Sequence, residues 1–333
     1  METTVIIDDH SRIAEVRRAA VNLGNSMGLT PELIAQAALV TSELCTNILK
    51  YAERGEVSLS TLCANGTAYG LDIVALDRGP GITNFEAAAK DGFSTGGSLG
   101  IGLGTMRRAA ALFDIYTAPG LGTALMVRLQ EKGAAAPVDG GFVSGSRMTP
   151  IRGETVSGDS WSCLRFDHSM AIAVVDGLGH GPKAAEAAHA AIEAFHQSVR
   201  EGGPAQAIQM AHQALLSTRG AVMAVACIDA QAQTVRYAGL GNISAVVHRQ
   251  GAATRLGSTD GTVGYGVRKA RESVVAWLPR STLILNTDGL SSRWNLSKHP
   301  GLLACHPVLI AAVLHRDFAR NKDDATVVVI QGH

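Results

Sequence analysis

The sequence has little charge, and it lacks the features that mark membrane, secreted and nucleic-acid-binding proteins. Only 17% of its 333 residues are charged, and the 29 acidic residues balance the 29 basic ones. Neither half is basic enough to indicate a nucleic-acid or anionic-membrane partner. No apolar run approaches the ~20 residues of a membrane-spanning helix, and no charged-then-apolar leader opens the chain. We therefore expect a cytoplasmic protein that binds neither nucleic acid nor membrane.

Cysteine is also scarce and irregularly placed. The five cysteines are odd in number, and no two of them have CxxC spacing. This excludes a zinc ribbon and argues against a disulfide framework. The apolar fraction of 46% is ample for packed cores, and the length predicts two domains of ordinary size.

The periodic segments fall into two groups around a linker-like stretch. Residues 131–141 (EKGAAAPVDGG) combine small residues and a proline with no apolar periodicity. We predict a domain at 1–132, a linker at 133–142 and a second domain at 143–333. In the first domain we expect helices at 11–27, 31–51 and 105–112 and strands at 56–62, 68–76, 113–117 and 123–129. In the second we expect strands at 171–175, 222–228, 234–238, 243–247, 282–286 and 326–330 and helices at 182–200 and 204–218.

The first domain carries polar residues with the spacing of a nucleotide pocket. Glu43 and Asn47 are four residues apart and share one face of the second helix. Asp77 ends a strand and is followed by Gly79-Pro80-Gly81, where a carboxylate can accept a hydrogen bond from an exocyclic amine. Taken singly, a Glu/Asn pair is more often a solvated helix face. The order and spacing of the whole set indicate a site.

A glycine-rich stretch, GGSLGIGLG, precedes the third predicted helix. Gly100, Gly102 and Gly104 free the backbone to turn, and N–H groups at a helix start bind phosphate well. Such a loop is more often only a turn. It is neither a Walker loop, because GxxxxGK[ST] is absent, nor a dinucleotide fingerprint. The following Arg107 and Arg108 most simply form an exposed helix face.

The second domain presents aspartates at the ends of three apolar strands and one after a glycine. Asp176 and Asp288 each follow an apolar strand and precede a glycine, the pair Asp323-Asp324 directly precedes the last strand, and Asp159 follows a glycine in VSGDSW. One Asp-Gly after a strand is usually a turn, but four acid sites aimed at one point would repel each other without cations. Oxygen ligands suit Mg²⁺ or Mn²⁺, and two such ions can activate water and clamp a phosphoryl group.

One histidine adjoins this acidic group. His180 follows Asp176 by four residues and is close enough to donate a proton to a leaving group. The simpler interpretation is a partly exposed loop histidine. The turn Gly239–Asn242 is a further segment that we expect near the acids.

The first domain resembles a known superfamily in its motifs NILKYA, DRGPGI, DGFSTGGSLGIGLG and GLGT. Over residues 11–130 it is similar to the GHKL ATPase/kinases, and within them to the RsbT-like anti-sigma-factor switch kinases of the stressosome. The resemblance implies a two-layer α/β sandwich in which Asn47 holds an ATP-bound Mg²⁺, Glu43 is the general base and Asp77 reads the adenine amine. It also implies a lid between Gly81 and Leu103. The other implied ATP-binding residues are Gly79, Gly81 and Thr123 around the adenine and Gly100, Gly102 and Gly104 beside the phosphates.

The second domain resembles the metal-dependent phosphatases of the SpoIIE-like branch, and specifically the short RsbX-like ones. GETVSGDSW, VVDGLGHGPKAAEAA, YAGLGN, NTDGL and KDDATVVVI carry the resemblance over residues 143–331. It implies an αββα sandwich with two Mg²⁺ or Mn²⁺ ions. The implied metal ligands are Asp159, Asp176 as the bridge, the Gly177 carbonyl, Asp288 and Asp323, the first residue of its pair.

Together the two resemblances imply a bifunctional switch. The first domain would phosphorylate Ser or Thr on a STAS-domain antagonist of a stressosome or sigma-factor pathway, and the second would dephosphorylate the same or a related protein. A downstream signalling protein or sigma factor is a further implied partner, and a homodimer is left open. One alternative is a phosphatase with a non-catalytic ATP-sensing or partner-sequestering domain. Another is a non-catalytic interaction protein, which would have lost acidic ligands that are all present here.

Overall fold

The computed structural model describes residues 2–64, 67–83, 102–133, 140–249, 251–266, 269–320 and 322–332. The chain divides into two compact units, Met1–Val138 with Ser297–Cys305, and Asp139–Leu296 with His306–His333. The linker predicted at 133–142 stays a prediction, since most of it lies outside the described residues. None of the described helices combines the length and apolar character that crossing a membrane requires.

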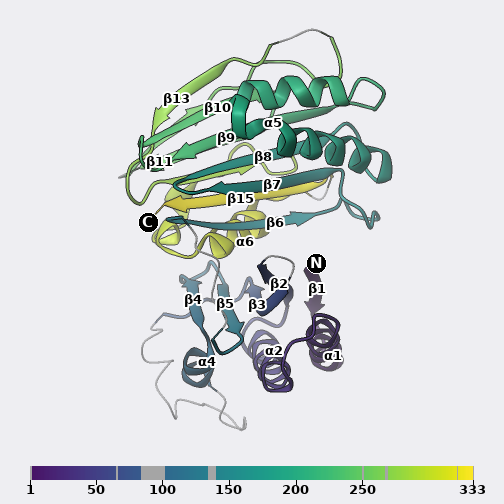
Figure 1. Ribbon diagram of the computed structural model, residues 1–333. Helices are drawn as coiled ribbons and strands as arrows, with labels where there is room; N and C mark the ends of the chain where they lie inside the picture. The colour runs from purple at the N-terminus through teal and green to yellow at the C-terminus, as the bar shows by residue number, and fades with distance from the viewer. Residues whose placement is uncertain are drawn as a thin grey trace. The chain divides into compact units, whose positions relative to one another are not determined.

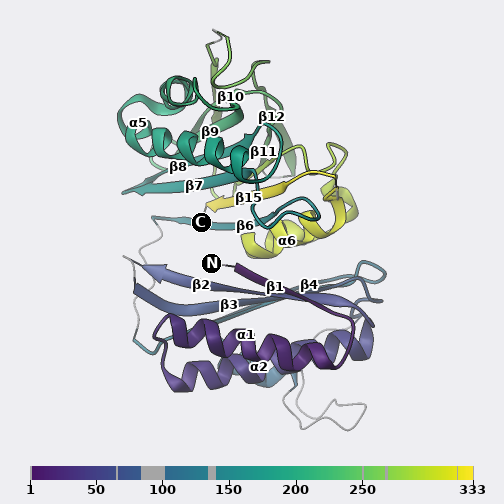
Figure 2. The same cartoon turned by 90° about the vertical axis from the view of Figure 1, so that its right-hand side faces the viewer.

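The N-terminal unit is a two-layer α/β sandwich (Figures 1 and 2). Its antiparallel sheet has the strand order β1-β2-β3-β5-β4, and a single apolar core joins one sheet face to the helices. The described elements are β1 (Glu2–Ile7), α1 (Ser11–Ser26), α2 (Pro31–Tyr51), β2 (Gly55–Ala64), β3 (Thr67–Asp77), α4 (Leu103–Ala109), β4 (Leu112–Thr117) and β5 (Thr123–Gln130). The predicted two-layer architecture is confirmed.

Helix α2 shows how the local sequence sets the fold of this unit. It begins as predicted, because the Thr30 hydroxyl accepts the Leu33 N–H and Pro31 occupies the first helical position. Its buried residues form one face, and Glu43 and Asn47 lie on another, partly exposed one. The Leu39 side chain of the same helix is 53% exposed.

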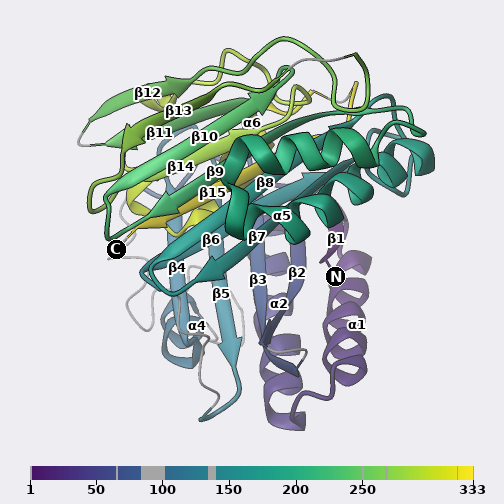
Figure 3. The ribbon, with the colours of Figure 1, turned by 45° about the horizontal axis from the view of Figure 1, so that its top comes forward.

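The C-terminal unit is an αββα sandwich, as predicted (Figures 1 and 3). Two five-stranded antiparallel sheets, β13-β10-β9-β8-β7 and β12-β11-β14-β15-β6, pack face to face around an apolar core. Helix α5 covers the first sheet and α6 packs on β6 and β15 of the second. The described elements are β6 (Phe142–Thr149), β7 (Asp159–Phe166), β8 (Ser169–Gly177), α5 (Pro182–Ala214), β9 (Ala221–Asp229), β10 (Thr234–Leu240), β11 (Ser244–Arg249), β12 (Ala252–Leu256), β13 (Glu272–Ala276), β14 (Thr282–Asn286), α6 (Pro307–Phe318) and β15 (Ala325–Gly332). Of the two 3₁₀ helices between β14 and α6, Leu302–Ala304 belongs to the N-terminal unit, and Leu296–Lys298 begins at the last residue before the segment Ser297–Cys305 of that unit.

The six strands predicted in this unit are all present, and the two helices predicted at 182–200 and 204–218 form one element with a kink. Gly203 has a φ of 71° and Pro204 follows it, which breaks the helical backbone between the two halves. The second half ends at Ala214, earlier than predicted. Helix α4 likewise begins two residues earlier than predicted and ends at Ala109.

Several elements were not predicted from the sequence. Strands β6 and β7 mix polar and apolar residues without clean alternation, β1 is short, and β12 and β13 are exposed edge strands. Helix α6, PVLIAAVLHRDF, is apolar on most sides. These segments gain their structure from pairing and packing with distant parts of the chain, which a local pattern does not report.

Candidate active sites

Asp77 organises the candidate nucleotide site at the end of β3. Its Oδ1 accepts the N–H of Gly79 at 2.8 Å and the N–H of Thr123 at 3.1 Å. Two hydrogen bonds therefore fix the carboxylate relative to both the DRGPGI turn and the start of β5. The structure thus brings Asp77, Gly79 and Thr123 together, although they span 46 residues.

Two glycines permit this close approach of the backbone. Gly81 has a φ of 75°, and a β-carbon there would collide with the Ala118 carbonyl oxygen. Gly122 has a φ of 73°, and a β-carbon there would collide with the Asp77 carbonyl oxygen. Both positions require glycine for backbone conformation and for space.

Thr117 is a member of this site that sequence reasoning missed. Its hydroxyl oxygen accepts the Ile82 N–H at 2.8 Å and lies 3.3 Å from the Thr123 hydroxyl oxygen. It ends β4 directly opposite Thr123 of β5. No motif marks Thr117, so only the strand register identifies it.

Helix α2 contributes the candidate base and metal ligand. Glu43 is half-buried, and burial raises the pKa of its carboxyl, partly opposed by Lys50. A raised pKa suits a proton acceptor. The end of α2 reaches the DRGPGI turn, since the Ala52 Cβ lies 2.7 Å from where a Gly79 β-carbon would stand.

The glycine-rich stretch before α4, predicted to border the phosphates, is described only in part. Gly102 is the N-cap residue of α4 and Gly104 lies in its first turn. Arg107 and Arg108 lie on an exposed face of α4, as the simpler interpretation expected. Gly100 and most of the expected lid lie outside the described residues.

In the C-terminal unit, strand pairing places the predicted acids at one end of the sandwich. Asp159 opens β7 and stands directly opposite Asp176 near the end of β8. Asp288 follows β14 and Asp323 precedes β15, its neighbour in the other sheet. Each sheet therefore contributes two carboxylates.

Asp159 provides the clearest evidence for a cation site. Its Oδ2 accepts the hydroxyl groups of Thr287 at 2.8 Å and Thr326 at 2.7 Å. Its Oδ1 is buried and has no hydrogen-bond partner among the described residues. A buried carboxylate oxygen without a partner is costly, and a bound cation would satisfy it.

The electrostatics of the acids agree with this interpretation. Burial raises the pKa of Asp159 to about 7. Burial, then repulsion from Asp159 and Asp288, raises the pKa of Asp176 to about 8. As they stand, the described residues contain no group of three or more Asp, Glu, His or Cys that could hold a metal ion. The oxygen donors suit Mg²⁺ or Mn²⁺, whose charge would offset the repulsion that keeps the carboxylates apart.

These pKa values predict a pH-dependent stabilisation by cations. Below about pH 7 protons occupy Asp159 and Asp176, and a cation must displace them, so we expect metal stabilisation to grow with pH. Saturating Mn²⁺ should raise the Tm of the C-terminal unit by about 5 °C at pH 8 and by less at pH 5.5. Differential scanning fluorimetry measures this. An equal shift at both pH values, or an undiminished shift in Asp176→Asn, would contradict it.

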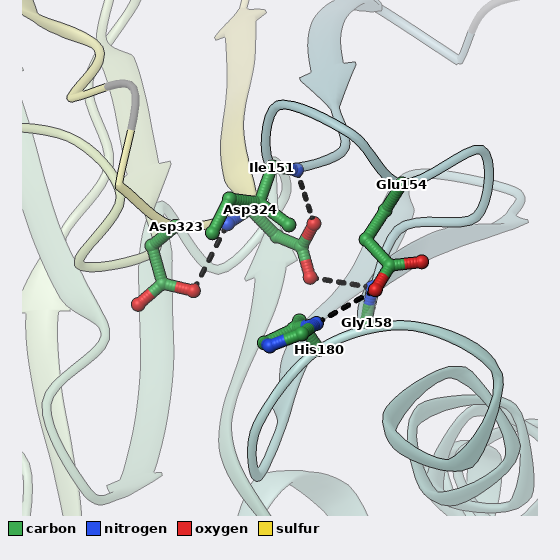
Figure 4. A network of polar contacts seen from close by, with 6 residues as sticks. All are labelled: Ile151, Glu154, Gly158, His180, Asp323 and Asp324. Carbon is green, nitrogen blue, oxygen red and sulfur yellow. Dashed lines mark hydrogen bonds and ion pairs between the residues drawn. The ribbon is translucent and has the colours of Figure 1, made fainter.

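Asp323 and Asp324 have different environments (Figure 4). Asp324 uses one carboxylate oxygen to accept the Ile151 N–H and the other to accept the Gly158 N–H, both at 2.7 Å. It therefore holds the loop that leads to Asp159. Asp323 accepts the Asp324 N–H at 3.0 Å through one carboxylate oxygen, so it is less occupied by hydrogen bonds to the backbone than Asp324 is.

His180 is part of a pair that the sequence did not reveal. Its Nδ1 lies 2.8 Å from Glu154 Oε1, and in Figure 4 its other ring nitrogen points away from Glu154, toward the side where Asp323 lies. Glu154 lies in the motif GETVSGDSW, but it is 26 residues away in the chain and nothing in the sequence pairs it with His180. The turn expected near the acids does reach them, since Asn242 Nδ2 donates to Asp288 Oδ2 at 2.8 Å.

Comparisons with known proteins found a matching family for each half of the chain. Residues 167–333 match the family described as Stage II sporulation protein E (SpoIIE), and residues 7–129 match the histidine kinase-like ATPase domain. The serine/threonine-protein kinase RsbT of Bacillus subtilis (strain 168) is 34% identical over 111 residues, which is 33% of this chain and 83% of RsbT.

Two solved structures each resemble somewhat more than half of the chain. A structure described as "The bacterial stressosome: a modular system that has been adapted to control secondary messenger signaling" is 26% identical with a TM-score of 0.53, and the match covers 57% of this chain and 98% of that one. RsbX in complex with magnesium is 22% identical with a TM-score of 0.50, over 58% of this chain and 96% of that one, and this likeness shows the fold.

The two folds and their sites define a regulatory protein of the kinase/phosphatase class, in which an ATPase-type domain precedes a serine/threonine phosphatase domain. Mixed α/β layers, acids at strand ends and an ATP-type pocket all agree with that class. The chain belongs to the Stage II sporulation protein E family through its C-terminal half. Its N-terminal third is a homologue of RsbT.

Proposed function

We propose that this chain is a bifunctional signalling switch. Its N-terminal unit phosphorylates Ser or Thr on a STAS-domain partner with ATP, and its C-terminal unit hydrolyses the phosphate from the same or a related protein. The observation that carries the phosphatase is the pairing of Asp159 and Asp176 across two strands, with a buried, unsatisfied oxygen on Asp159. The likeness to RsbT and to a stressosome structure supports the kinase and the partner.

In the proposed phosphatase, Asp176 would be the ligand shared by the Mg²⁺ or Mn²⁺ ions. Asp159, Asp288, Asp323 and the Gly177 carbonyl would complete the ligand set. When bound, the ions supply an activated water and charge stabilisation for the phosphoryl group. Thr287 and Thr326 hold the Asp159 carboxylate in place, and Asn242 does the same for Asp288.

In the proposed kinase, the chain positions ATP and the acceptor hydroxyl. Asp77, held by two backbone N–H groups, accepts a hydrogen bond from the adenine amine, and Gly79, Gly81 and Thr123 shape that pocket. Asn47 would hold the Mg²⁺ of the bound ATP, and Glu43, one helical turn before it, would take the proton from the acceptor hydroxyl. Gly102 and Gly104, at the start of α4, would border the phosphates. Gly100 and most of the loop predicted as the ATP lid, between Gly81 and Leu103, lie outside the described residues.

His180 is proposed to protonate the leaving Ser or Thr oxygen, with Glu154 orienting its ring. We expect His180→Gln to lower the hydrolysis of a phosphoserine peptide by about a hundredfold, because a serine alkoxide leaves poorly without a proton. Hydrolysis of p-nitrophenyl phosphate should fall much less, since nitrophenolate needs no proton to leave. Steady-state kinetics on both substrates measure the difference.

The control for this prediction is His189→Gln, which changes an exposed histidine on α5. It should leave both rates near those of the unmodified protein. An equal loss on the two substrates in His180→Gln would indicate that His180 shapes the site and donates no proton.

The whole proposal is tested by capture of partners from the native cell with and without ATP, followed by phosphosite mapping. Recovery of a STAS-domain protein that gains phosphoserine or phosphothreonine with ATP, and loses it with Mn²⁺ in the absence of ATP, is the expected result. Recovery of partners whose phosphorylation state the chain does not change would overturn it.

A further inference from the structure

Three exposed apolar side chains of the C-terminal unit lie on three turns that contact one another. Leu178, directly after Gly177, is 40% exposed, Leu216 is 60% exposed and Tyr265 is 72% exposed. We call these three residues the apolar platform. Large apolar side chains that are grouped on a surface commonly mark an interaction site.

Backbone hydrogen bonds join the three turns. The Leu178 N–H donates to the Gly220 carbonyl at 3.0 Å, and Leu178 Cδ1 lies 3.8 Å from where a Gly220 β-carbon would stand. The next residue, Ala221, exchanges two hydrogen bonds with Val263, at 3.0 and 2.7 Å. The turns of Leu178 and Tyr265 are therefore both attached to the start of β9.

The remaining contact places Leu216 beside the Tyr265 turn. The Cβ of Leu215 lies 2.8 Å from where a Gly264 β-carbon would stand, and the Gly264 N–H donates to His212 Nδ1 at 3.1 Å. The end of α5 and the turn after it thus pack directly against the segment that carries Tyr265.

The platform adjoins the carboxylate site. Asp176 and Gly177 pair with Val222 and Ala221 at the start of β9, so the same short stretch of backbone carries the acids and supports the platform. Arg219 Nη1 lies 3.0 Å from where a Gly179 β-carbon would stand. This exposed guanidinium makes no ion pair with any residue in the described part of the chain.

We propose that the apolar platform binds the polypeptide on either side of the phosphorylated Ser or Thr of a protein substrate, through apolar side chains near the phosphoresidue. Arg219 faces the negative charge of the same segment. This inference rests on the proposed phosphatase function and adds a preference for the sequence around the phosphate. An extended segment covers about 3.3 Å per residue. Side chains two or three positions from the phosphoserine therefore extend past the carboxylates and reach the apolar platform beside them.

Two observations favour a short phosphorylated segment as the occupant. The platform is continuous with the site that would hold the phosphate. The positive charge of Arg219 lies beside the platform and complements a phosphorylated chain. Three side chains also form too small a surface for a stable protein–protein interface, which buries roughly 800 Å² per partner.

The test uses the full chain with Mn²⁺ and two phosphoserine peptides of equal length. One carries leucine two and three residues on either side of the phosphoserine, and the other carries asparagine there. We expect the full chain to prefer the leucine peptide about tenfold in kcat/KM, because burying apolar side chains contributes on that scale. Leu216→Ser and Tyr265→Ser should each reduce the preference to about threefold or less.

Val274→Ser is the matched control. Val274 is 61% exposed on the edge strand β13 of the same sheet, and its replacement should leave the tenfold preference intact. Equal kcat/KM for the two peptides, or a preference that survives both platform changes, would overturn the platform. Failure of the full chain to hydrolyse even p-nitrophenyl phosphate would instead overturn the phosphatase function, and the platform with it.

Discussion

Replacing Asp176 with asparagine is expected to lower Mn²⁺-dependent hydrolysis of p-nitrophenyl phosphate about a thousandfold, which is about 4 kcal/mol of lost transition-state stabilisation. The physical reason is that Asp176 is a buried carboxylate near the other acids of the site: burial first, and then repulsion from those acids, raises its pKa to about 8. An amide at this position removes a negative charge that would help to hold the cations. Steady-state kinetics with added Mn²⁺ or Mg²⁺ and after chelation measure the effect.

Asp229→Asn is the control for this change. Asp229 ends β9, at the other end of the same sheet, where it accepts the N–H groups of Gln231 and Ala232 in an exposed turn. The same loss of charge there should leave the rate within about twofold, because a surface change away from a special feature costs little. Activity that survives both Asp176→Asn and chelation would rule out the proposed metal site.

Replacing Glu43 with glutamine is expected to lower phosphoryl transfer from ATP to a STAS-domain protein at least about a hundredfold, the scale of general-base catalysis. The amide keeps the size of the side chain and removes its ability to accept a proton. ATP binding should stay close to that of the unmodified protein, because Asp77 and its hydrogen bonds are untouched. Label transfer from radiolabelled ATP and the Kd of a fluorescent ATP analogue separate the two effects.

Glu32→Gln provides a matched control on the same helix. Glu32 is exposed in the first turn of α2, eleven residues before Glu43, and its replacement should affect neither transfer nor binding. If Glu43→Gln transferred phosphate as fast as the unmodified protein, Glu43 would not be the base. If ATP bound but no label reached any STAS-domain protein, the N-terminal unit would be an ATP sensor that accompanies a phosphatase.

Much of the fold was predictable because its elements carry local signals. Thr30-Pro31 marks the start of α2, and β8 is an apolar run that ends at Asp176-Gly177. The failures have a common cause. Strand β6 contains Gly145 and polar residues, and it is a strand because it pairs with β15. Helix α6 and the edge strands likewise depend on packing that no short window of sequence describes.

The candidate sites divide in the same way. Asp176, Asp288 and Asp323 stood out because each lies at the boundary of an apolar strand, and Asp159 stood out because it follows a glycine in the same order of acid motifs, although their roles as ligands stay predictions. The supporting residues did not stand out. Thr117 lies in no motif. Thr287 and Thr326 lie inside the motifs NTDGL and KDDATVVVI, but only the structure shows that both hydroxyl groups donate to Asp159, and only the structure pairs Glu154 with His180.

The sequence by itself determined the two-part character of this protein, the residue types at both sites and the chemistry that they suit. These properties follow from helical and strand periods and from residues within a few positions of one another. Only the tertiary structure decided which carboxylates lie opposite each other and which of their oxygens accept hydrogen bonds. It placed Asp159 opposite Asp176, gave both oxygens of Asp324 to backbone N–H groups and left one buried oxygen of Asp159 without a partner in the described residues. The physical reason is that strand register joins residues far apart in the chain, and a shift of one residue would turn each carboxylate to the opposite face.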